Sequence, residues 1–356
     1  MVEPYRAVVI QNDVEMPNIK ASASDVKATM RRNLDRVCQL IDWAAREKSS
    51  DEEVLIALPE SMLHSFPRAG WSVKELLKAT IKIPGEETER ISAKAVEKGA
   101  HIVGHSWETL DEFPERFFST AFIIDPQGKI ILKYRKVQPA FNIEGTTSPH
   151  DVMDEYVKRY GEKSLFPVVD TPMGHLGCFI CYDGMFPEVT RCLAMNGAEV
   201  LIRPTSWFDP TASEPYNWWE MQNRMRASEN TCYVVAPNLG NTTNSAERPK
   251  ALSGNSMIVD YEGRIMARAG GFGEATIDTV LHIDALRYRR SETRWNPLAT
   301  LRTEAYAAYY KASYYPMNHW KDRPLDKLSE VTDTIAKTIE KLRKRNVIAK
   351  KPSPRN

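Results

Sequence analysis

The chain has no apolar run long enough to cross a membrane, and its charges nearly cancel. Lysine and arginine together number 48 and aspartate and glutamate 47, so the formal net charge is +1. This balance gives no electrostatic reason to expect nucleic acid or an anionic membrane as a partner. The first apolar run, at residues 5–11, is predicted to be a strand with no signal peptide ahead of it. We therefore expect a cytoplasmic protein.

Cysteine is scarce, with five residues in 356, and the patterns that bind metals or nucleotides are missing. An odd number of thiols, in a chain large enough to fold without disulfides, indicates reduced cysteines. Cys178 and Cys181 form one C-x-x-C, but no second C-x-x-C, H-x₃-H or H-E-x-x-H accompanies it. The G-x-S-x-G, G-x-G-x-x-G and P-loop patterns are absent as well. The sequence therefore predicts neither a metal nor a cofactor.

Short apolar runs rich in valine and isoleucine are abundant. They predict strands at residues 6–11, 54–60, 101–107, 119–125, 129–136, 175–183, 199–206, 233–239, 256–263 and 276–284. Helical spacing between them predicts helices at about 26–44, 86–99, 186–197 and 217–231, the first opened by Ser24 and Asp25. This alternation, with hairpins expected around DPQGK and DYEGR, predicts an α/β layered fold with mixed sheets.

The last part of the chain has a different character. A mostly charged helix carries one apolar stripe, made of Leu328, Val331, Ile335, Ile339 and Leu342. A basic, proline-containing tail follows, and we expect it to be solvated. The stripe is expected to pack on the body of the protein or on a neighbouring subunit.

Three of the five cysteines lie within fifteen positions, at 178, 181 and 192. Cys178 and Cys181 are three residues apart on a predicted strand, so their side chains point to opposite faces and cannot form a metal or redox pair. Cys181 ends the apolar run, ahead of a turn and of a helix that begins near Phe186. Open α/β folds place ligands at such strand ends, and a helix N-terminus favours a thiolate. Core packing is the alternative for Cys181, and the expectation for Cys192 and Cys232.

Two other ionisable residues end apolar runs in the same way. Glu60 closes VLIALPE and Lys136 closes KIILKYRK. Either residue alone is more simply a surface residue. A thiol nucleophile, however, needs a base and a group that stabilises the oxyanion, so the three together predict a catalytic set. None of the seven histidines lies in a recognisable motif beside the thiol.

At these positions the sequence resembles the nitrilase superfamily of carbon–nitrogen hydrolases. The segments ALPES, KYRKVQP and CFICYDGMFPEVTR are similar to its three signatures, and the resemblance extends over about residues 5–310. It implies a four-layer α-β-β-α sandwich with a Glu-Lys-Cys set. KYRKVQPAFNIEG is similar to the aliphatic amidases and formamidases, whose further glutamate corresponds to Glu144. Tyr182 after the nucleophile, where typical nitrilases have tryptophan, favours amides.

The resemblance implies a domain at 1–310, followed by a C-terminal extension at 311–356 for oligomerisation. It also implies that the protein is a homo-oligomeric amidase. The substrate would be a small-molecule amide, and ammonia would be released as a thioester forms on Cys181. Glu60 would transfer protons, Lys136 would stabilise the oxyanion with the N–H of Tyr182, and Glu144 would orient the amide or the water. Trp207 is expected to line the pocket.

Some expectations stay open between alternatives. An N-carbamoyl amide hydrolase or a nitrilase would use the same fold, and an idle relative would serve as a binding or assembly module. All four catalytic positions of the family are occupied here, which argues against a catalytically inactive relative. The segment 145–169 is longer than in short-chain aliphatic amidases and is expected near the pocket mouth. Asp183 is expected to form a structural ion pair around the turn.

Overall fold

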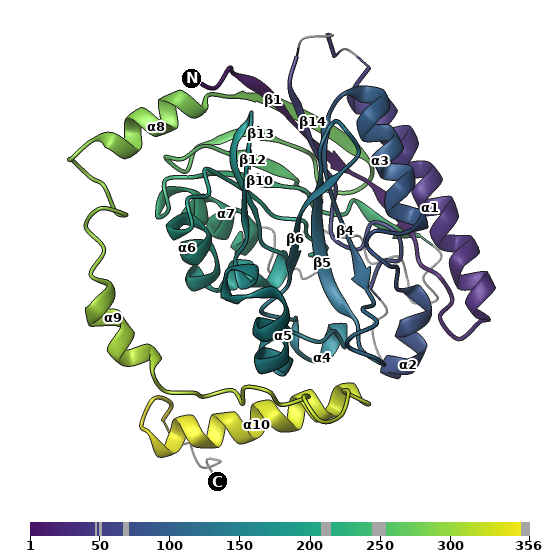
Figure 1. Ribbon diagram of the computed structural model, residues 1–356, viewed down its shortest axis with the longest axis vertical. Helices are drawn as coiled ribbons and strands as arrows, with labels where there is room; N and C mark the ends of the chain where they lie inside the picture. Colours follow the sequence, from purple (N-terminus) through teal and green to yellow (C-terminus); the bar gives the residue numbers. More distant parts are fainter. Residues whose placement is uncertain (47, 50–51, 67–70, 208–214, 244–253, 350–356) are drawn as a thin grey trace.

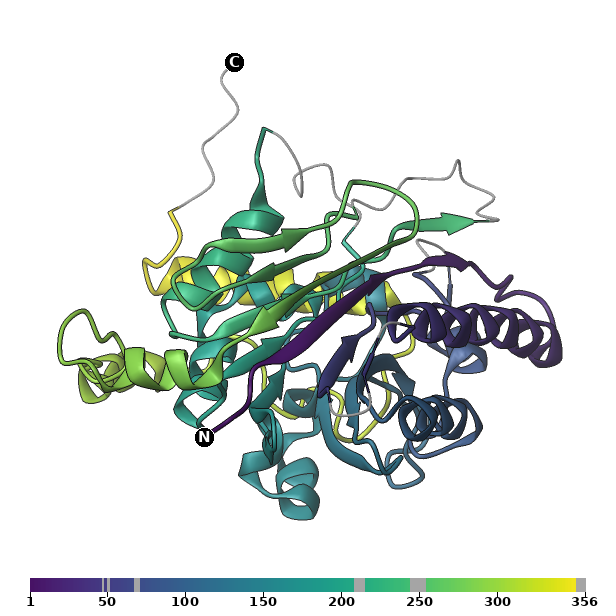
Figure 2. The ribbon, with the colours of Figure 1, turned by 90° about the horizontal axis from the view of Figure 1, so that it is seen from above.

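The computed structural model describes residues 1–46, 48–49, 52–66, 71–207, 215–243 and 254–349. Two six-stranded sheets face each other, with helices on both outer faces (Figures 1 and 2). The first sheet has the order β14-β1-β3-β4-β5-β6. Its strands are β1 (Tyr5–Gln11), β3 (Val54–Ala57), β4 (His101–Glu108), β5 (Phe118–Ile124), β6 (Ile130–Arg135) and β14 (Ala275–Leu281).

The second sheet has the order β13-β12-β10-β9-β8-β7. Its strands are β7 (Val168–Thr171), β8 (Gly174–Cys178), β9 (Val200–Ile202), β10 (Tyr233–Ala236), β12 (Met257–Val259) and β13 (Ile265–Arg268). A separate parallel pair joins β2 (Asp13–Glu15) and β11 (Asn241–Thr243). Both sheets mix parallel and antiparallel pairing, and both predicted hairpins, β5–β6 and β12–β13, are antiparallel.

Successive side chains of a strand point to opposite faces of the sheet, and the two faces contribute to two separate hydrophobic cores. In β1, Ala7 and Val9 point into a central core between the sheets, whereas Val8 and Ile10 point into an outer core. The outer core packs under α1 (Ala23–Ala44) and α3 (Glu86–Lys98). Because both faces of the strand are covered, its sequence is a continuous apolar run instead of an alternating one. The predicted α-β-β-α sandwich is confirmed.

The fourth layer consists of α6 (Pro187–Met195) and α7 (Trp218–Ser228), which cover the second sheet (Figure 1). The shorter helical elements are α2 (Val73–Leu76), η1 (Leu77–Ala79), α4 (Phe141–Glu144), η2 (Pro149–Val152), α5 (Met153–Tyr160), η3 (Glu162–Leu165) and η4 (Cys181–Met185). Helix α1 begins after Ser22, whose hydroxyl accepts from the N–H of Asp25, so the prediction that Ser24 and Asp25 open it was wrong by a half-turn.

After β14 the chain forms an arm around the body, through α8 (Ile283–Ser291), α9 (Thr303–Tyr310) and α10 (Leu328–Lys344) (Figure 1). Trp320 and Leu325, ahead of α10, are buried in the outer core. A Cβ on Gly145 would lie 3.2 Å from Leu328, so α10 begins directly against the segment that follows α4. None of the described helices is long and apolar enough to span a membrane.

Candidate active site

Glu60, Lys136 and Cys181 all follow strands, as predicted, but each lies just beyond the regular pairing. β3 ends at Ala57, β6 at Arg135 and β8 at Cys178, so the predicted strands at 54–60 and 175–183 were too long. Glu60 lies in a turn, and Cys181 begins η4. The three residues are thereby placed just beyond the carboxyl ends of β3, β6 and β8.

Lys136 joins two glutamates. Its Nζ donates to Glu60 Oε1 at 2.8 Å and to Glu144 Oε1 at 2.7 Å. The lysine is 1% exposed and both glutamates are 0% exposed. A buried ammonium between two buried carboxylates has little freedom to move, because each partner would lose a charge-assisted hydrogen bond. The structure thus brings Glu144 into the same cluster as Glu60 and Lys136.

The second oxygen of each glutamate binds the backbone. Glu60 Oε2 accepts from the N–H of Ser206 at 3.0 Å, and Glu144 Oε2 accepts from the N–H of Ala140 at 2.5 Å. The first bond ties the end of the first sheet to the segment after β9 of the second sheet. The second closes α4 on itself, so Glu144 is held by its own helix.

Cys181 has an unusual backbone. Its φ is +42°, in the left-handed region that a residue with a Cβ rarely adopts. Its N–H donates to the carbonyl of Pro204 at 3.0 Å. The thiol of Cys181 acts on the pKa of Glu60, so the two side chains lie close together, and Cys181 remains partly exposed. Strain of this kind occurs where the surrounding structure fixes a residue.

Burial dominates the titration of this cluster. It raises the pKa of Glu60 to about 7, assisted by the charge of Glu144 and opposed by Lys136 and by the thiol of Cys181. Burial also raises the pKa of the Cys181 thiol above its usual range, together with Glu60, whereas Lys136 opposes this. For Lys136 burial disfavours the ammonium, yet Glu144 and Glu60 outweigh it and raise its pKa. Glu60 can therefore both accept and donate a proton near neutral pH.

Cys178 lies in a different environment. It is 0% exposed within the central core, where burial raises its pKa. Cys181 is in the cluster with Lys136 and Glu60. Because β8 ends at Cys178 and Cys181 begins η4, the prediction that both lie on one strand and face opposite sides was wrong. Cys232 is also buried in the central core, whereas Cys192 is only partly buried.

The two predicted substrate-binding residues flank the cluster. The ring of Tyr182 packs edge-on against Phe186 at 5.4 Å, and burial raises the pKa of Tyr182 to about 12. Trp207 follows Ser206, and its ring meets Trp219 at 6.3 Å. Both residues are partly buried. A contact with substrate stays a prediction for each.

Sequence reasoning misjudged Asp183 and missed Arg203. Among the described residues Asp183 has no cation as a partner: its donors are the hydroxyl of Tyr134 and the N–H groups of Gln138 and Ile180, so the expected ion pair was wrong. The guanidinium of Arg203 donates to the carbonyl of Cys181. Its signal was a charged residue inside the apolar run EVLIRPTS.

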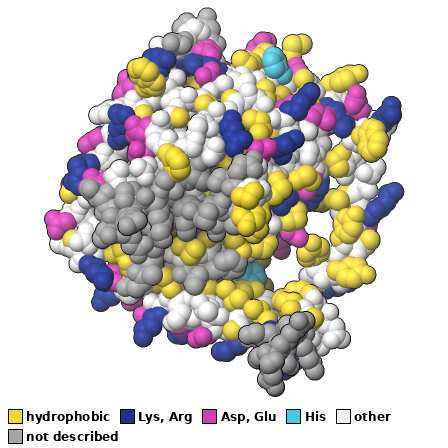
Figure 3. Space-filling view, turned by 180° about the vertical axis from the view of Figure 1, so that it is seen from behind, with side chains coloured by type: hydrophobic (Ala, Val, Ile, Leu, Met, Phe, Trp, Pro, Cys, Tyr) yellow, Lys and Arg dark blue, Asp and Glu magenta, His cyan; other side chains and the backbone are white. Residues whose placement is uncertain are grey.

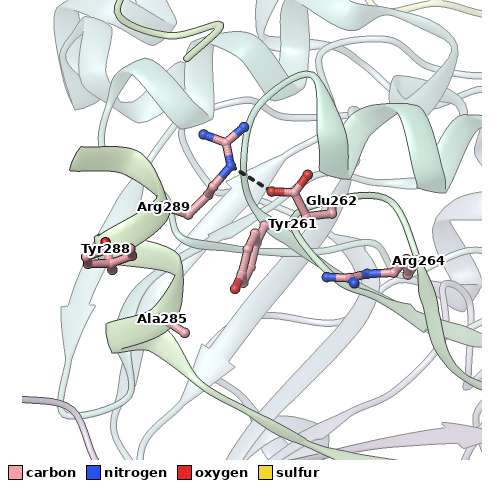
Figure 4. A pocket seen from close by; sticks show the side chains of 6 residues that line it. All are labelled: Tyr261, Glu262, Arg264, Ala285, Tyr288 and Arg289. Atoms are coloured by element: carbon pink, nitrogen blue, oxygen red, sulfur yellow. Dashed lines mark hydrogen bonds and ion pairs between the residues drawn. The ribbon is translucent and has the colours of Figure 1, made fainter. Parts of the chain in front are cut away.

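A surface hollow of about 720 Å³ lies apart from this cluster, between the β12–β13 hairpin and α8 (Figure 4). Its lining residues are Tyr261, Glu262, Arg264, Ala285, Tyr288 and Arg289. Arg289 pairs with Glu262 at 2.7 Å, and Arg264 with Asp260 at 2.7 Å. Because its arginines are paired and it shares no residue with the Glu60–Lys136–Glu144–Cys181 cluster, it adds nothing to the chemistry of that cluster.

Comparisons with known proteins identify the family of the chain. A model of the carbon–nitrogen hydrolase family matches residues 14–288. Omega-amidase NIT2-B of Xenopus laevis is 30% identical over 263 residues, which cover 73% of this chain and 86% of the relative. A formamidase of Bacillus thuringiensis (strain Al Hakam) is 36% identical over 186 residues, covering 52% of this chain and 50% of the relative.

Solved structures show the same fold. Saccharomyces cerevisiae Nit3, described as a member of branch 10 of the nitrilase superfamily, has a TM-score of 0.64 at 22% identity, covering 85% of this chain and 97% of Nit3. An amidase from Nesterenkonia sp. has a TM-score of 0.61 at 19% identity, covering 86% of this chain and 96% of the amidase.

Proposed function

Because the chain belongs to the carbon–nitrogen hydrolase family, we propose that it hydrolyses a carboxamide to an acid and ammonia through a thioester on Cys181. The observation that carries the proposal is the ammonium of Lys136 held between Glu60 and Glu144, with the thiol of Cys181 close enough to Glu60 and Lys136 to act on their pKa values. Relatives named omega-amidase and formamidase support an amide as the substrate.

In the first half of the proposed reaction, Glu60 takes the proton of the Cys181 thiol and the sulfur attacks the amide carbon. The carbonyl oxygen becomes an oxyanion, stabilised by the ammonium of Lys136 and the N–H of Tyr182. As the C–N bond breaks, Glu60 passes its proton to the nitrogen, and ammonia leaves. The pKa of Glu60, about 7, suits a group that must accept and then give a proton.

In the second half, water attacks the thioester. Glu60 takes a proton from the water, the C–S bond breaks, and the proton returns to the sulfur as the acid leaves. Glu144 touches Lys136 and orients either the amide nitrogen or the attacking water. The lysine supplies the positive charge at the oxyanion, so no metal is needed for these steps.

A screen for ammonia release tests the proposal. The panel holds short aliphatic amides, formamide, ω-amides of dicarboxylic acids and aromatic amides, with carbamoyl amino acids and nitriles as competing classes. We expect turnover of at least one carboxamide, unchanged by EDTA and abolished in Cys181→Ala. Turnover confined to carbamoyl compounds or nitriles would replace the amide assignment. Loss of activity in EDTA that zinc restores would overturn the metal-free mechanism.

We also propose that the chain forms a homo-oligomer through its arm and outer helices. Helix α9 has no buried residue, and Tyr306, Tyr309 and Tyr310 are exposed on it. Figure 3 shows hydrophobic side chains along this arm. Methionines on the helical layer of the second sheet, Met195 and Met221, are exposed as well. Light scattering at several protein concentrations tests the assembly, and a monomeric mass at all of them would contradict it.

A further inference from the structure

Arg203 binds the backbone of the proposed nucleophile. It follows β9 directly and is 0% exposed. Nε and Nη2 of its guanidinium donate to the carbonyl oxygen of Cys181 at 3.2 and 2.7 Å. Nη1 donates to Asn223 Oδ1 at 2.8 Å, and Nη2 also donates to Gln222 Oε1 at 2.6 Å. Every nitrogen of the guanidinium therefore has an acceptor.

All of these acceptors are neutral. Rings of Phe179, Trp207 and Trp219 surround the guanidinium, with centroids 5.5, 5.7 and 4.8 Å from its central carbon. Ring faces attract a cation, but they do not cancel its charge. Among the described residues no carboxylate pairs with Arg203 within 4.0 Å, whereas the neighbouring Arg226 pairs with Glu229 at 2.7 Å. A buried cation without a counter-ion is costly, so its presence here calls for an anion in the working site.

The position of Arg203 indicates which anion this is, because its guanidinium binds the backbone of Cys181, the residue that carries the thiol. Burial lowers the pKa of Arg203 to about 10, Cys181, Asp183 and Glu60 act to raise it, and Arg226 acts to lower it. The guanidinium is therefore charged at neutral pH. Conversely, Arg203 and Lys136 lower the pKa of Cys181 against burial, Glu60 and Glu144. Lys136 is hydrogen-bonded to both glutamates, whereas Arg203 makes no direct ion pair with a carboxylate among the described residues and is bound to the backbone of Cys181 itself.

The loop is also shaped around the guanidinium. A Cβ on Gly184 would lie 2.0 Å from Nη2 of Arg203, so only glycine leaves room for it. The carbonyl of Cys181 accepts from Arg203, and the N–H of Cys181 donates to the carbonyl of Pro204. Both backbone polar groups of the strained residue are therefore held by hydrogen bonds. A left-handed non-glycine conformation is strained and persists only where such contacts hold it.

We propose that Arg203 is a positioning residue for the reaction: its guanidinium holds Cys181 in the left-handed conformation, and its unpaired charge stabilises the Cys181 thiolate. The inference rests on the proposed function, in which Cys181 reacts as a thiolate. Arg203 thus has two separate roles. The two N–H groups that bind the Cys181 carbonyl (the guanidinium fork) fix the backbone, and the positive charge stabilises the thiolate. A substitution that keeps only the charge can separate them.

Alkylation of Cys181 by iodoacetamide is measured between pH 7 and 12, with the modified residue identified by peptide mapping. This readout needs no amide substrate, so it stays informative if no amide is turned over. In Arg203→Met we expect the midpoint of alkylation to rise by about one pH unit or more, because an adjacent cation is lost. In Arg203→Lys the midpoint should stay near that of the wild type, while kcat falls by about a hundredfold at similar KM, because the fork is lost.

Arg226→Met is the matched control. Arg226 is also buried and donates to the same loop, at the carbonyl of Gly184, but its charge is balanced by Glu229. We expect this variant to lose thermal stability without a shift in the alkylation midpoint. Equal midpoints in Arg203→Met and Arg226→Met would reduce Arg203 to a structural residue. If Arg203→Met does not fold, Arg203→Lys tests the positioning role alone. A wild-type kcat in Arg203→Lys would overturn that role.

Discussion

The hydroxyl of Tyr134 donates to the carboxylate of Asp183 at 2.7 Å, and this bond joins the strand that precedes Lys136 to the loop that contains Cys181. Tyr134 lies in β6, two residues before Lys136, and Asp183 lies two residues after Cys181. The same carboxylate accepts from the N–H groups of Gln138 and Ile180 at 2.9 Å each. One buried side chain thus sets the distance between two segments of the candidate site that come from different sheets.

The two neighbouring cysteines should respond in opposite ways to truncation. Cys181→Ala is expected to abolish turnover while the protein stays folded, because the thiol is the proposed nucleophile and the residue is only partly buried. Cys178→Ala removes a side chain from the central core, so it should lower thermal stability and retain activity. Ammonia release and thermal unfolding measure both effects. A dead Cys178→Ala variant, or residual activity above a trace in Cys181→Ala, would contradict the assignment.

The pH dependence of kcat/KM should report the titration of Glu60. The carboxylate form accepts the proton of the thiol, so activity requires Glu60 to be ionised in the free enzyme. Because burial raises the pKa of Glu60 to about 7, kcat/KM is expected to rise with pH through about 7 and not through the usual range of a glutamate. Initial rates at low substrate concentration between pH 5 and 9 measure this limb. A profile already flat above pH 5.5 would mean that Glu60 is ionised much earlier.

Glu144→Gln tests the fourth residue of the cluster. Glutamine keeps the shape but removes a charge from Lys136 and adds a donor, so the acyl carbon should be mispositioned. We expect amide hydrolysis to fall by about a hundredfold or more, with Cys181 still readily alkylated by iodoacetamide. Glu199→Gln serves as the control, because Glu199 is also buried but pairs with Arg287 of α8. Wild-type turnover in Glu144→Gln would remove Glu144 from the mechanism.

Removal of residues 328–356 should affect assembly and activity together. Beyond the first turn of α10, Ile335, Ile339 and Leu342 are only partly buried, so the stripe has apolar surface left for a partner. We expect a lower particle mass by light scattering. Loss of Leu328 from its place over Gly145 should also lower kcat, because Glu144 precedes that glycine. An unchanged particle mass would mean that the apolar stripe of α10 packs only on its own subunit.

The sequence predicted most of the layers because strands covered on both faces have continuous apolar runs. β1, with Ala7 and Val9 on one face and Val8 and Ile10 on the other, is such a strand. The short strands β2, β7 and β11 were not predicted, because their sequences DVE, VVDT and NTT form no long apolar run. Strand ends were misplaced at Glu60 and Cys181, where side-chain and loop contacts override the apolar pattern.

The candidate site was predictable only where a charge ended an apolar run. Glu60, Lys136 and Cys181 had that signal, and Glu144 came from the resemblance to amidases. The roles of Asp183 and Arg203 depend on partners 49 and 22 residues away along the chain, Tyr134 and Cys181. Local spacing carries no information on such contacts, because the fold alone brings the segments together.

The pairing of β1 with both β3 and β14 has a consequence for synthesis on the ribosome. Tyr5 pairs with Leu281, so one edge of β1 stays open until nearly three hundred residues have left the exit tunnel. At usual elongation rates that interval is on the order of tens of seconds. During it the nascent chain exposes an apolar strand edge, a template for wrong pairing with other chains. Chaperone demand should therefore peak late in translation and fall once β14 has docked.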